Sequence, residues 1–343
     1  AFVLTAEVGD TMFVAQVKSM EANRPYVVMA DEDVTFGTTN ETLVPVAPDR
    51  LEQETTPNYA LLGTYAPINA KDAEGQRMYI LDENASWSLV KDAAEGEQVL
   101  SPYSVYMQTM KSNAPATIMM REAVFNIVDG AYTEYENPED KIGRIIYTRT
   151  LNNAWNALYV PFQIELTEEF LENYDVAYIN NVHSYDRDDD GELDDWSIEI
   201  VKIKKLAKLK ANHPYVIRPK SDEAINLNIA QIYSTLYSTA PEKQIALTCS
   251  SVYKKYSVKG LYSKTESGDL DNGNYVYAIN KRGEWQRMDL STSLVPFRVY
   301  LSIANIDGSP VAADEIPAKT IRMRVVGEED DDGTTFIYDV EVD

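Results

Sequence analysis

The sequence contains a single cysteine, Cys249, and only two histidines, His183 and His213. One cysteine excludes a disulfide within the chain. The histidines form no HxH or HExxH pattern and have no cysteine pair beside them, which argues against a zinc site. The G-x-S-x-G motif of α/β-hydrolases is also missing, so nothing in the sequence indicates a Ser-His-Asp hydrolase.

The chain has fewer basic than acidic residues: 31 Lys and Arg and 55 Asp and Glu give a net charge of −24. This charge repels nucleic acid and anionic membrane surfaces, and we therefore expect no nucleic-acid partner. The chain has no apolar run of about 18 residues, so no membrane-spanning segment is expected. Its first residues carry no charged region or cleavage site, which predicts a removed targeting segment or a fragment of a longer chain.

One sequence motif occurs twice. Residues 21–28 and 210–217 share Asn-x-Pro-Tyr followed by two β-branched residues, at an offset of 189 positions (212 − 23). Asn and Pro favour a turn, and Tyr with two β-branched residues favours a strand after it. Three further landmarks repeat in the same order with similar offsets. They are Gly63 with Gly260, the Tyr79/Trp87 hairpin with the Tyr277/Trp285 hairpin, and residues 102–106 with residues 296–300. This order predicts a duplicated module.

We therefore predict an all-β fold made of two tandem related antiparallel β-sandwich-like modules, residues 1–147 and 148–343, with one short helix after Thr167. Thr167 followed by two acidic residues is typical of a helix N-terminus. The first module is expected to be an N-terminally short copy. Only 22 residues precede Asn23, whereas Arg149 and Asn212 are separated by 63 positions (212 − 149). Counterparts of residues 155–164 and of the acidic loop described next are expected to be missing from it.

The acidic loop, residues 186–195, is the sharpest candidate for a ligand site. Acids at positions 1, 3 and 5, Gly at position 6 and Asp at position 9 match most of a calcium loop, in which alternating carboxylates converge on one hard cation. Position 12 is Ser197 instead of the bidentate Glu, and the flanking segments resemble strands, which favours the alternative of a solvated acidic hairpin loop. The candidate Ca²⁺ ligands are Asp186, Asp188, Asp190, Glu192 and Asp194.

Residues 155–162, the acidic loop, residues 211–215 and residues 294–297 together resemble a module of secreted or surface proteins from Bacteroides-type gut bacteria. Such proteins are described as cell-adhesion proteins, and their modules sometimes stand beside BspA-like leucine-rich repeats. The resemblance covers residues 145–301 well and 12–107 more weakly, and this chain has no leucine-rich repeat. It implies an extracytoplasmic protein without established catalytic residues: secreted, periplasmic, lipid-anchored or associated with the outer membrane.

We therefore expect the chain to be a non-enzymatic adhesion or scaffold protein. Its expected partner is a protein or glycan ligand at the cell surface. The alternative is a glycan-binding module, which belongs in that case to a polysaccharide-processing system. An exposed coplanar set of Tyr and Trp side chains would favour the glycan interpretation, and a flat surface would favour protein adhesion. A glycoside hydrolase would need two close carboxylates in a cleft, and no pair stands out among the 55 acids.

Overall fold

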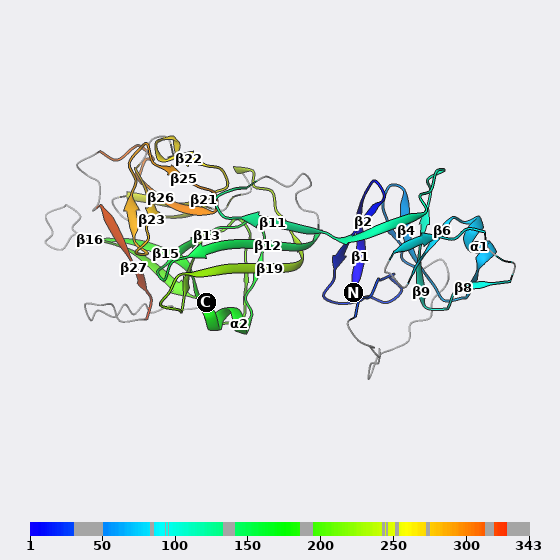
Figure 1. Ribbon diagram of the computed structural model, residues 1–343. Coiled ribbons are helices and arrows are strands. Elements are labelled where there is room, and N and C mark those ends of the chain that lie inside the picture. Colours follow the sequence, from blue (N-terminus) through cyan, green and yellow to red (C-terminus); the bar gives the residue numbers. More distant parts are fainter. Residues whose placement is uncertain are drawn as a thin grey trace. The chain divides into compact units, whose positions relative to one another are not determined.

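The computed structural model shows an all-β chain, as predicted from the sequence (Figure 1). The predicted helix is α2 (Glu168–Asn173), where the Thr167 side chain accepts a hydrogen bond from the Phe170 N–H at 3.1 Å. A second short helix, α1 (Ala70–Gly75), was not predicted. The structure describes residues 1–30, 51–82, 86–92, 94, 96–132, 141–185, 195–241, 244, 246–250, 254–271, 275–312 and 319–327.

The chain divides into two compact units. Unit 1 comprises Ala1–Phe125, Lys141–Ile145 and Ile232–Ser234, and unit 2 comprises Asn126–Asp140, Ile146–Gln231 and Thr235–Asp343. The boundary predicted at 147/148 lies inside one strand, β12. That strand belongs to a three-stranded sheet of order β11-β12-β19, formed by β11 (Val124–Val128), β12 (Lys141–Leu151) and β19 (Ile225–Thr235).

Unit 1 is built on a sheet of order β1-β2-β10-β7-β6-β9-β4-β3. A small sheet of β5 and β8 flanks α1. The strands are β1 (Phe2–Val8), β2 (Thr11–Gln16), β3 (Glu54–Thr55), β4 (Tyr59–Thr64), β5 (Ile68–Asn69), β6 (Met78–Leu81), β7 (Trp87–Leu89), β8 (Gln98–Leu100), β9 (Ser104–Thr109) and β10 (Thr117–Glu122).

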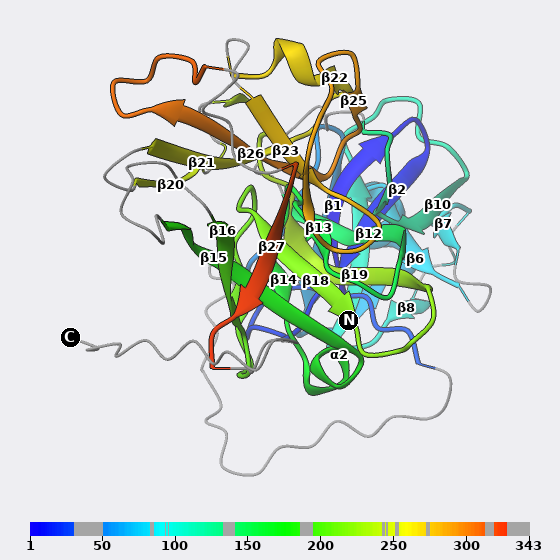
Figure 2. The same ribbon diagram turned by 90° about the vertical axis from the view of Figure 1, so that its left-hand side faces the viewer.

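Unit 2 is built on a sheet of order β13-β18-β15-β16-β27-β24-β23-β26-β21-β20, with small sheets β14-β17 and β22-β25 (Figure 2). The 3₁₀ helix η3 (Ser267–Asp269) follows β22. The strands are β13 (Asn156–Leu158), β14 (Ile164–Glu165), β15 (Tyr174–Tyr185), β16 (Asp195–Lys202), β17 (Lys208–Leu209), β18 (Tyr215–Pro219), β20 (Leu247–Ser250), β21 (Lys254–Leu261), β22 (Thr265–Glu266), β23 (Tyr275–Ile279), β24 (Trp285–Arg287), β25 (Ser293–Leu294), β26 (Arg298–Asn305) and β27 (Thr320–Val325).

The strands of the two units follow one another in the same spatial order. The unit 1 sheet, β1-β2-β10-β7-β6-β9-β4-β3, corresponds strand by strand to β15-β16-β27-β24-β23-β26-β21-β20 in unit 2. β10 pairs with β2 in parallel and with β7 antiparallel, and β27 does the same with β16 and β24. The register agrees as well, since Leu81 is paired with Trp87 and Ile279 with Trp285. The repeated sequence landmarks therefore occupy corresponding positions in the two sheets.

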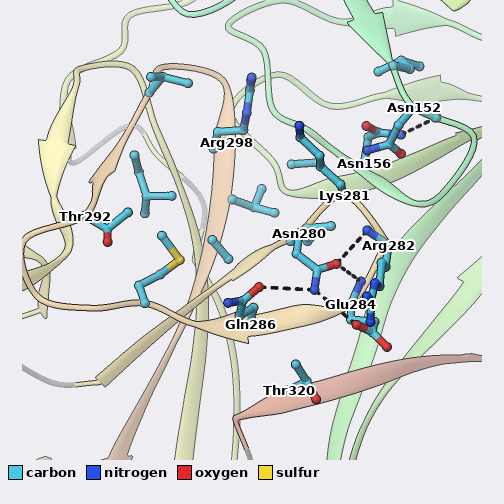
Figure 3. Close-up of a pocket in the computed structure, with 18 of the residues that line it drawn as sticks. Asn152, Asn156, Asn280, Lys281, Arg282, Glu284, Gln286, Thr292, Arg298 and Thr320 are labelled. Atoms are coloured by element: carbon cyan, nitrogen blue, oxygen red, sulfur yellow. Dashed lines mark hydrogen bonds between the residues drawn. The ribbon is translucent and has the colours of Figure 1, made fainter. Parts of the chain in front are cut away.

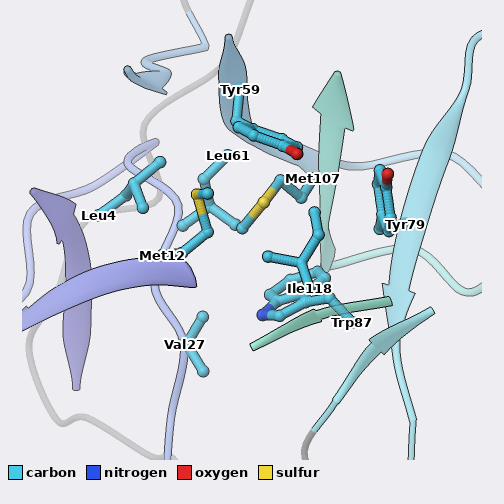
Figure 4. Packing of buried hydrophobic residues seen from close by; sticks show 9 residues of the cluster. All are labelled: Leu4, Met12, Val27, Tyr59, Leu61, Tyr79, Trp87, Met107 and Ile118. Atoms are coloured by element: carbon cyan, nitrogen blue, oxygen red, sulfur yellow. The ribbon is translucent and has the colours of Figure 1, made fainter. Parts of the chain in front are cut away.

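The core of unit 1 is a cluster of buried side chains around Trp87 and Tyr59 (Figure 4). Each of its nine members has a buried counterpart at the corresponding position of unit 2. The pairs are Leu4 with Ile179, Met12 with Ile198, Val27 with Val216, Tyr59 with Tyr256, Leu61 with Val258, Tyr79 with Tyr277, Trp87 with Trp285, Met107 with Leu301 and Ile118 with Ile321.

At the start of unit 1, a two-residue turn stands where unit 2 has the acidic loop in its sequence. β1 and β2 occupy the places of β15 and β16, and the turn between β1 and β2 consists of Gly9 and Asp10. Gly9 has a φ of +62°, which a tight turn requires and which glycine adopts without strain. A counterpart of β13 is not found among the described residues of unit 1.

Candidate functional site

The predicted calcium ligands, residues 186–194, lie outside the described residues. In the part of the chain that the structure describes, no group of three His, Cys, Asp or Glu side chains is arranged to hold a metal ion. Cys249 is on β20, paired with Tyr256 across the ladder. His183 lies beside the buried Glu199, with its Nε2 at 2.5 Å from the Glu199 carboxylate. Of the helices that are described, none is both long and apolar enough to cross a membrane.

The candidate site is a pocket of about 1120 Å³ in unit 2, referred to here as the unit 2 pocket (Figure 3). Its walls come from the end of β12 and the turn that follows it, from the β23–β24 hairpin, and from the segment that leads into β26. The hairpin approaches the β12–β13 turn closely. Gly283 has a φ of +76°, and a Cβ on it would lie 2.8 Å from the backbone nitrogen of Trp155. Only glycine fits this contact without displacing the turn.

Asparagine side chains fix the two turns at the mouth of the pocket. The Asn280 carbonyl accepts from the backbone N–H groups of Arg282 and Glu284 at 2.8 and 3.1 Å, and its amide donates to the side chain of Glu284 at 3.2 Å (Figure 3). Across the pocket, the Asn156 amide donates to the carbonyls of Asn152 and Ala154. Such side chain to backbone bonds make these turns rigid.

The charge of the lining is opposite in sign to that of the whole chain. Five of the lining side chains are basic and two, Glu284 and Asp289, are acidic, so the lining carries a net charge of +3. The exposed Lys281 and Arg282 belong to no ion pair among the described residues. The basic lining residues are Arg149, Lys281, Arg282, Arg287 and Arg298.

Two of these arginines contact one half-buried carboxylate, that of Asp129. Arg298 donates two hydrogen bonds to Asp129, at 2.6 and 2.8 Å, and Arg149 Nε lies 3.8 Å from the same group. Burial raises the pKa of Asp129, but the bonds from Arg298 and the charges of both arginines outweigh burial and hold that pKa below its ordinary value. Burial lowers the pKa of Arg149, whose side chain is only 7% exposed.

One positive charge therefore remains in excess at this cluster, because Asp129 offers one negative charge to two guanidinium groups. Burial also lowers the pKa of Arg298, but its bonds to Asp129 more than compensate and raise it. Arg149 additionally donates to the Ala157 carbonyl, and Arg149 Nε is buried without a hydrogen-bond partner. An arrangement of this kind attracts an anionic ligand to the pocket.

Aromatic side chains take no part in the pocket, since none is among its lining residues. All four tryptophans of the chain are buried: Trp87, Trp155, Trp196 and Trp285. The exposed pair Tyr65 and Tyr103 belongs to unit 1, and its rings are nearly perpendicular at 78°. A coplanar platform for stacking on sugars is thus not found among the described residues.

The sequence reasoning missed the pocket and its arginines. Arg149 carried a signal, because it belongs to the inward phase of β12: Ile145, Tyr147 and Leu151 are buried, and so is Arg149. A charged residue in a buried strand phase indicates an internal ion pair. Its partner Asp129 could not be identified, because the contact joins β12 to a residue outside any strand. Comparisons with protein-family models, with curated proteins and with solved structures found no match to this chain.

Proposed function

We propose that this chain is a non-enzymatic, extracytoplasmic adhesion or scaffold protein, and that unit 2 binds an acidic segment of a partner protein in its pocket. The observation that carries the proposal is the net charge of +3 in the pocket lining of a chain whose net charge is −24. Arg149 and Arg298 supply charge at the base, and Lys281 and Arg282 supply exposed donors at the mouth. Guanidinium groups match carboxylates in shape and charge.

An acidic protein segment fits this pocket better than a neutral glycan. Recognition of neutral sugars relies on stacking against aromatic rings, and this pocket has none. Its walls instead combine apolar side chains, such as Leu151 and Val299, with amide and guanidinium donors. A glycan-binding module remains the second candidate for one form of ligand only, a glycan that carries carboxylates, because the same donors would bind uronic acids.

We also infer that the two units are copies of one module. The common strand order, the parallel pairing of β10 and β27, and the nine matched core positions support this inference. A counterpart of the unit 2 pocket requires the β12–β13 turn, and unit 1 has no such turn among its described residues. Among the described residues, the proposed pocket is therefore found in the second copy alone.

Fluorescence anisotropy with the full chain tests the proposal. The probes are a labelled poly-glutamate peptide, a labelled oligogalacturonate and a labelled poly-serine peptide. We expect the poly-glutamate peptide to bind, and the double variant Lys281→Glu/Arg282→Glu to weaken binding about tenfold or more, since each exposed charge pair contributes up to about 1 kcal/mol. The matched control is Lys255→Glu/Lys264→Glu, which reverses two exposed charges outside the pocket.

Each outcome of this experiment has a defined meaning. Tighter binding of oligogalacturonate than of poly-glutamate, with the same dependence on Lys281 and Arg282, would favour the glycan candidate. If neither anionic probe binds, or if the control variant loses as much affinity as the pocket variant, the pocket is not the binding site. Binding of poly-serine with equal affinity would show that charge plays no part.

A further inference from the structure

In unit 2, a glycine on β21 makes room for a tyrosine ring from a neighbouring segment. Tyr159 is fully buried, and its ring lies on Gly260 so closely that a Cβ there would be 2.2 Å from two ring atoms. Tyr159 also packs on Tyr262, at 4.8 Å between ring centroids, and Tyr262 contacts Phe297 at 5.9 Å. Glycine within a strand marks such close approaches.

Unit 1 has the same recess without an occupant among its described residues. Gly63 corresponds to Gly260, and the nearest atom to a Cβ on it would be a backbone oxygen at 4.0 Å. Tyr65 and Tyr103 correspond to Tyr262 and Phe297, and they meet in the same way, at 5.5 Å and 78° against 5.9 Å and 75°. Yet Tyr65 is 46% and Tyr103 83% exposed, whereas Tyr262 and Phe297 are buried.

The polar contacts around the recess are also alike. The Tyr65 hydroxyl donates to the Asn23 side chain at 3.0 Å, as Tyr262 does to Asn212 at 2.7 Å. Both asparagines have a positive φ, 68° and 55°. The Asn212 N–H donates to the Val160 carbonyl at 2.9 Å, next to Tyr159. The matching N–H of Asn23 has no partner within the described residues.

The strand edge beside the recess is also unpaired among the described residues. In unit 2, β13 pairs antiparallel with β18, joining Asn156 to Ile217 and Leu158 to Tyr215. The unit 1 counterpart of this part of β18 is residues 26–28, where Val27 exchanges two hydrogen bonds with Phe2. Successive residues of a strand direct their hydrogen-bonding groups to opposite sides. The backbone N–H and C=O groups of Tyr26 and Val28 therefore point to the far side, where no described residue forms a backbone hydrogen bond with them.

We propose that unit 1 accepts a β-strand from a partner polypeptide along residues 26–28, and that a tyrosine of this strand fills the recess over Gly63. The occupant has the chemistry of residues 156–162 of this chain, in which an extended segment places Tyr159 on Gly260. Backbone hydrogen bonds supply affinity in such strand addition, and side-chain recesses supply specificity. This surface is on a different unit from the pocket proposed above, so either proposal can fail alone.

A labelled synthetic peptide of residues 153–164, added to the full chain, tests the proposal by fluorescence anisotropy. We expect saturable binding, and a loss of about tenfold or more when the tyrosine of the peptide is replaced by alanine, as is usual for an aromatic anchor. On the protein, Gly63→Leu fills the recess and should abolish binding. Tyr103→Ala, which removes a mostly exposed ring, should weaken it without unfolding the unit.

The control on the protein is Gly75→Leu, because a Cβ on Gly75 meets no atom within 4 Å and the residue lies at the end of α1, outside the strands that form the recess. Circular dichroism confirms that each variant is folded. The proposal is overturned if the peptide does not bind, if the alanine peptide binds equally well, or if Tyr103→Ala leaves the affinity unchanged. Undiminished binding to a folded Gly63→Leu protein would place the peptide elsewhere.

Discussion

The contrast between Gly260 and Gly63 gives a sharp test of the structure, because one substitution is made at two corresponding positions. In Gly260→Ala the new methyl group would lie 2.2 to 2.3 Å from three atoms of the Tyr159 ring. The ring cannot withdraw easily, since it is fully buried and packed on Tyr262. In Gly63→Ala the nearest neighbour is 4.0 Å away, an ordinary contact.

The two substitutions should change the free energy of unfolding differently: Gly260→Ala should lower it, and Gly63→Ala should not. Overpacking a core by one methyl group costs about 1–3 kcal/mol. We expect Gly260→Ala at the upper end, about 3 kcal/mol, because three ring atoms are met together. Gly63→Ala should be neutral or more stable by roughly 0.5 kcal/mol, since alanine reduces the entropy of the unfolded chain. For a unit of this size a loss of about 3 kcal/mol lowers Tm by about 6–12 °C.

Urea unfolding followed by tryptophan fluorescence measures the effect, because three of the four tryptophans, Trp155, Trp196 and Trp285, belong to unit 2. Far-ultraviolet circular dichroism reports both units. An unchanged unfolding midpoint for Gly260→Ala would refute the position of Tyr159. A comparable loss in Gly63→Ala would show that the recess of unit 1 is filled in the free protein, which would also remove the basis for strand addition there.

Two further predictions concern charge. The lowered pKa of Asp129 means that its carboxylate stabilises the folded state above the ordinary aspartate pKa of about 4, and that this contribution is lost as pH falls toward the lower folded value. Asp129→Asn should therefore lower the free energy of unfolding at pH 7 by about 2–3 kcal/mol, somewhat less than for a fully buried pair, and should reduce the loss of stability in acid when the urea midpoint is measured against pH. The control, Asp222→Asn at an exposed position, should do neither. Calcium titration by calorimetry should show binding in the millimolar range that Asp188→Ala removes, and the absence of heat would leave the acidic loop a solvated turn.

Much of the fold could be predicted because its signals are local. The hairpins around Trp87 and Trp285 combine alternating apolar residues with a turn of fixed length, and the structure has strands on both sides of each turn. Thr167 caps α2 as its sequence context predicts. The duplication itself stays an inference, although the corresponding strands and core residues support it.

What could not be predicted depends on contacts between distant segments. Asp129 and Arg298 are 169 positions apart, and only the folded chain brings them together. The parallel pairing of β10 with β2 leaves no local pattern in the sequence, because strand period is the same in parallel and antiparallel ladders. The helix α1 escaped notice because its six residues are too few for a helical period, and its cap Asn69 is also typical of a turn.

The parallel pairing of the closing strands has a consequence for biosynthesis. Met120 lies opposite Met12, and Met323 lies opposite Ile198, so each sheet is completed only across 108 (120 − 12) and 125 (323 − 198) positions of chain. At roughly 5–20 residues per second, a ribosome needs about 5–25 s to deliver the closing strand after its neighbour. During that interval β2 and β16 have no partner on one side, and unpaired strands of this kind aggregate readily. Each of these two sheets is therefore most vulnerable just before its last strand emerges, and substitutions that weaken β10 or β27 should reduce the yield of folded protein more than its final stability.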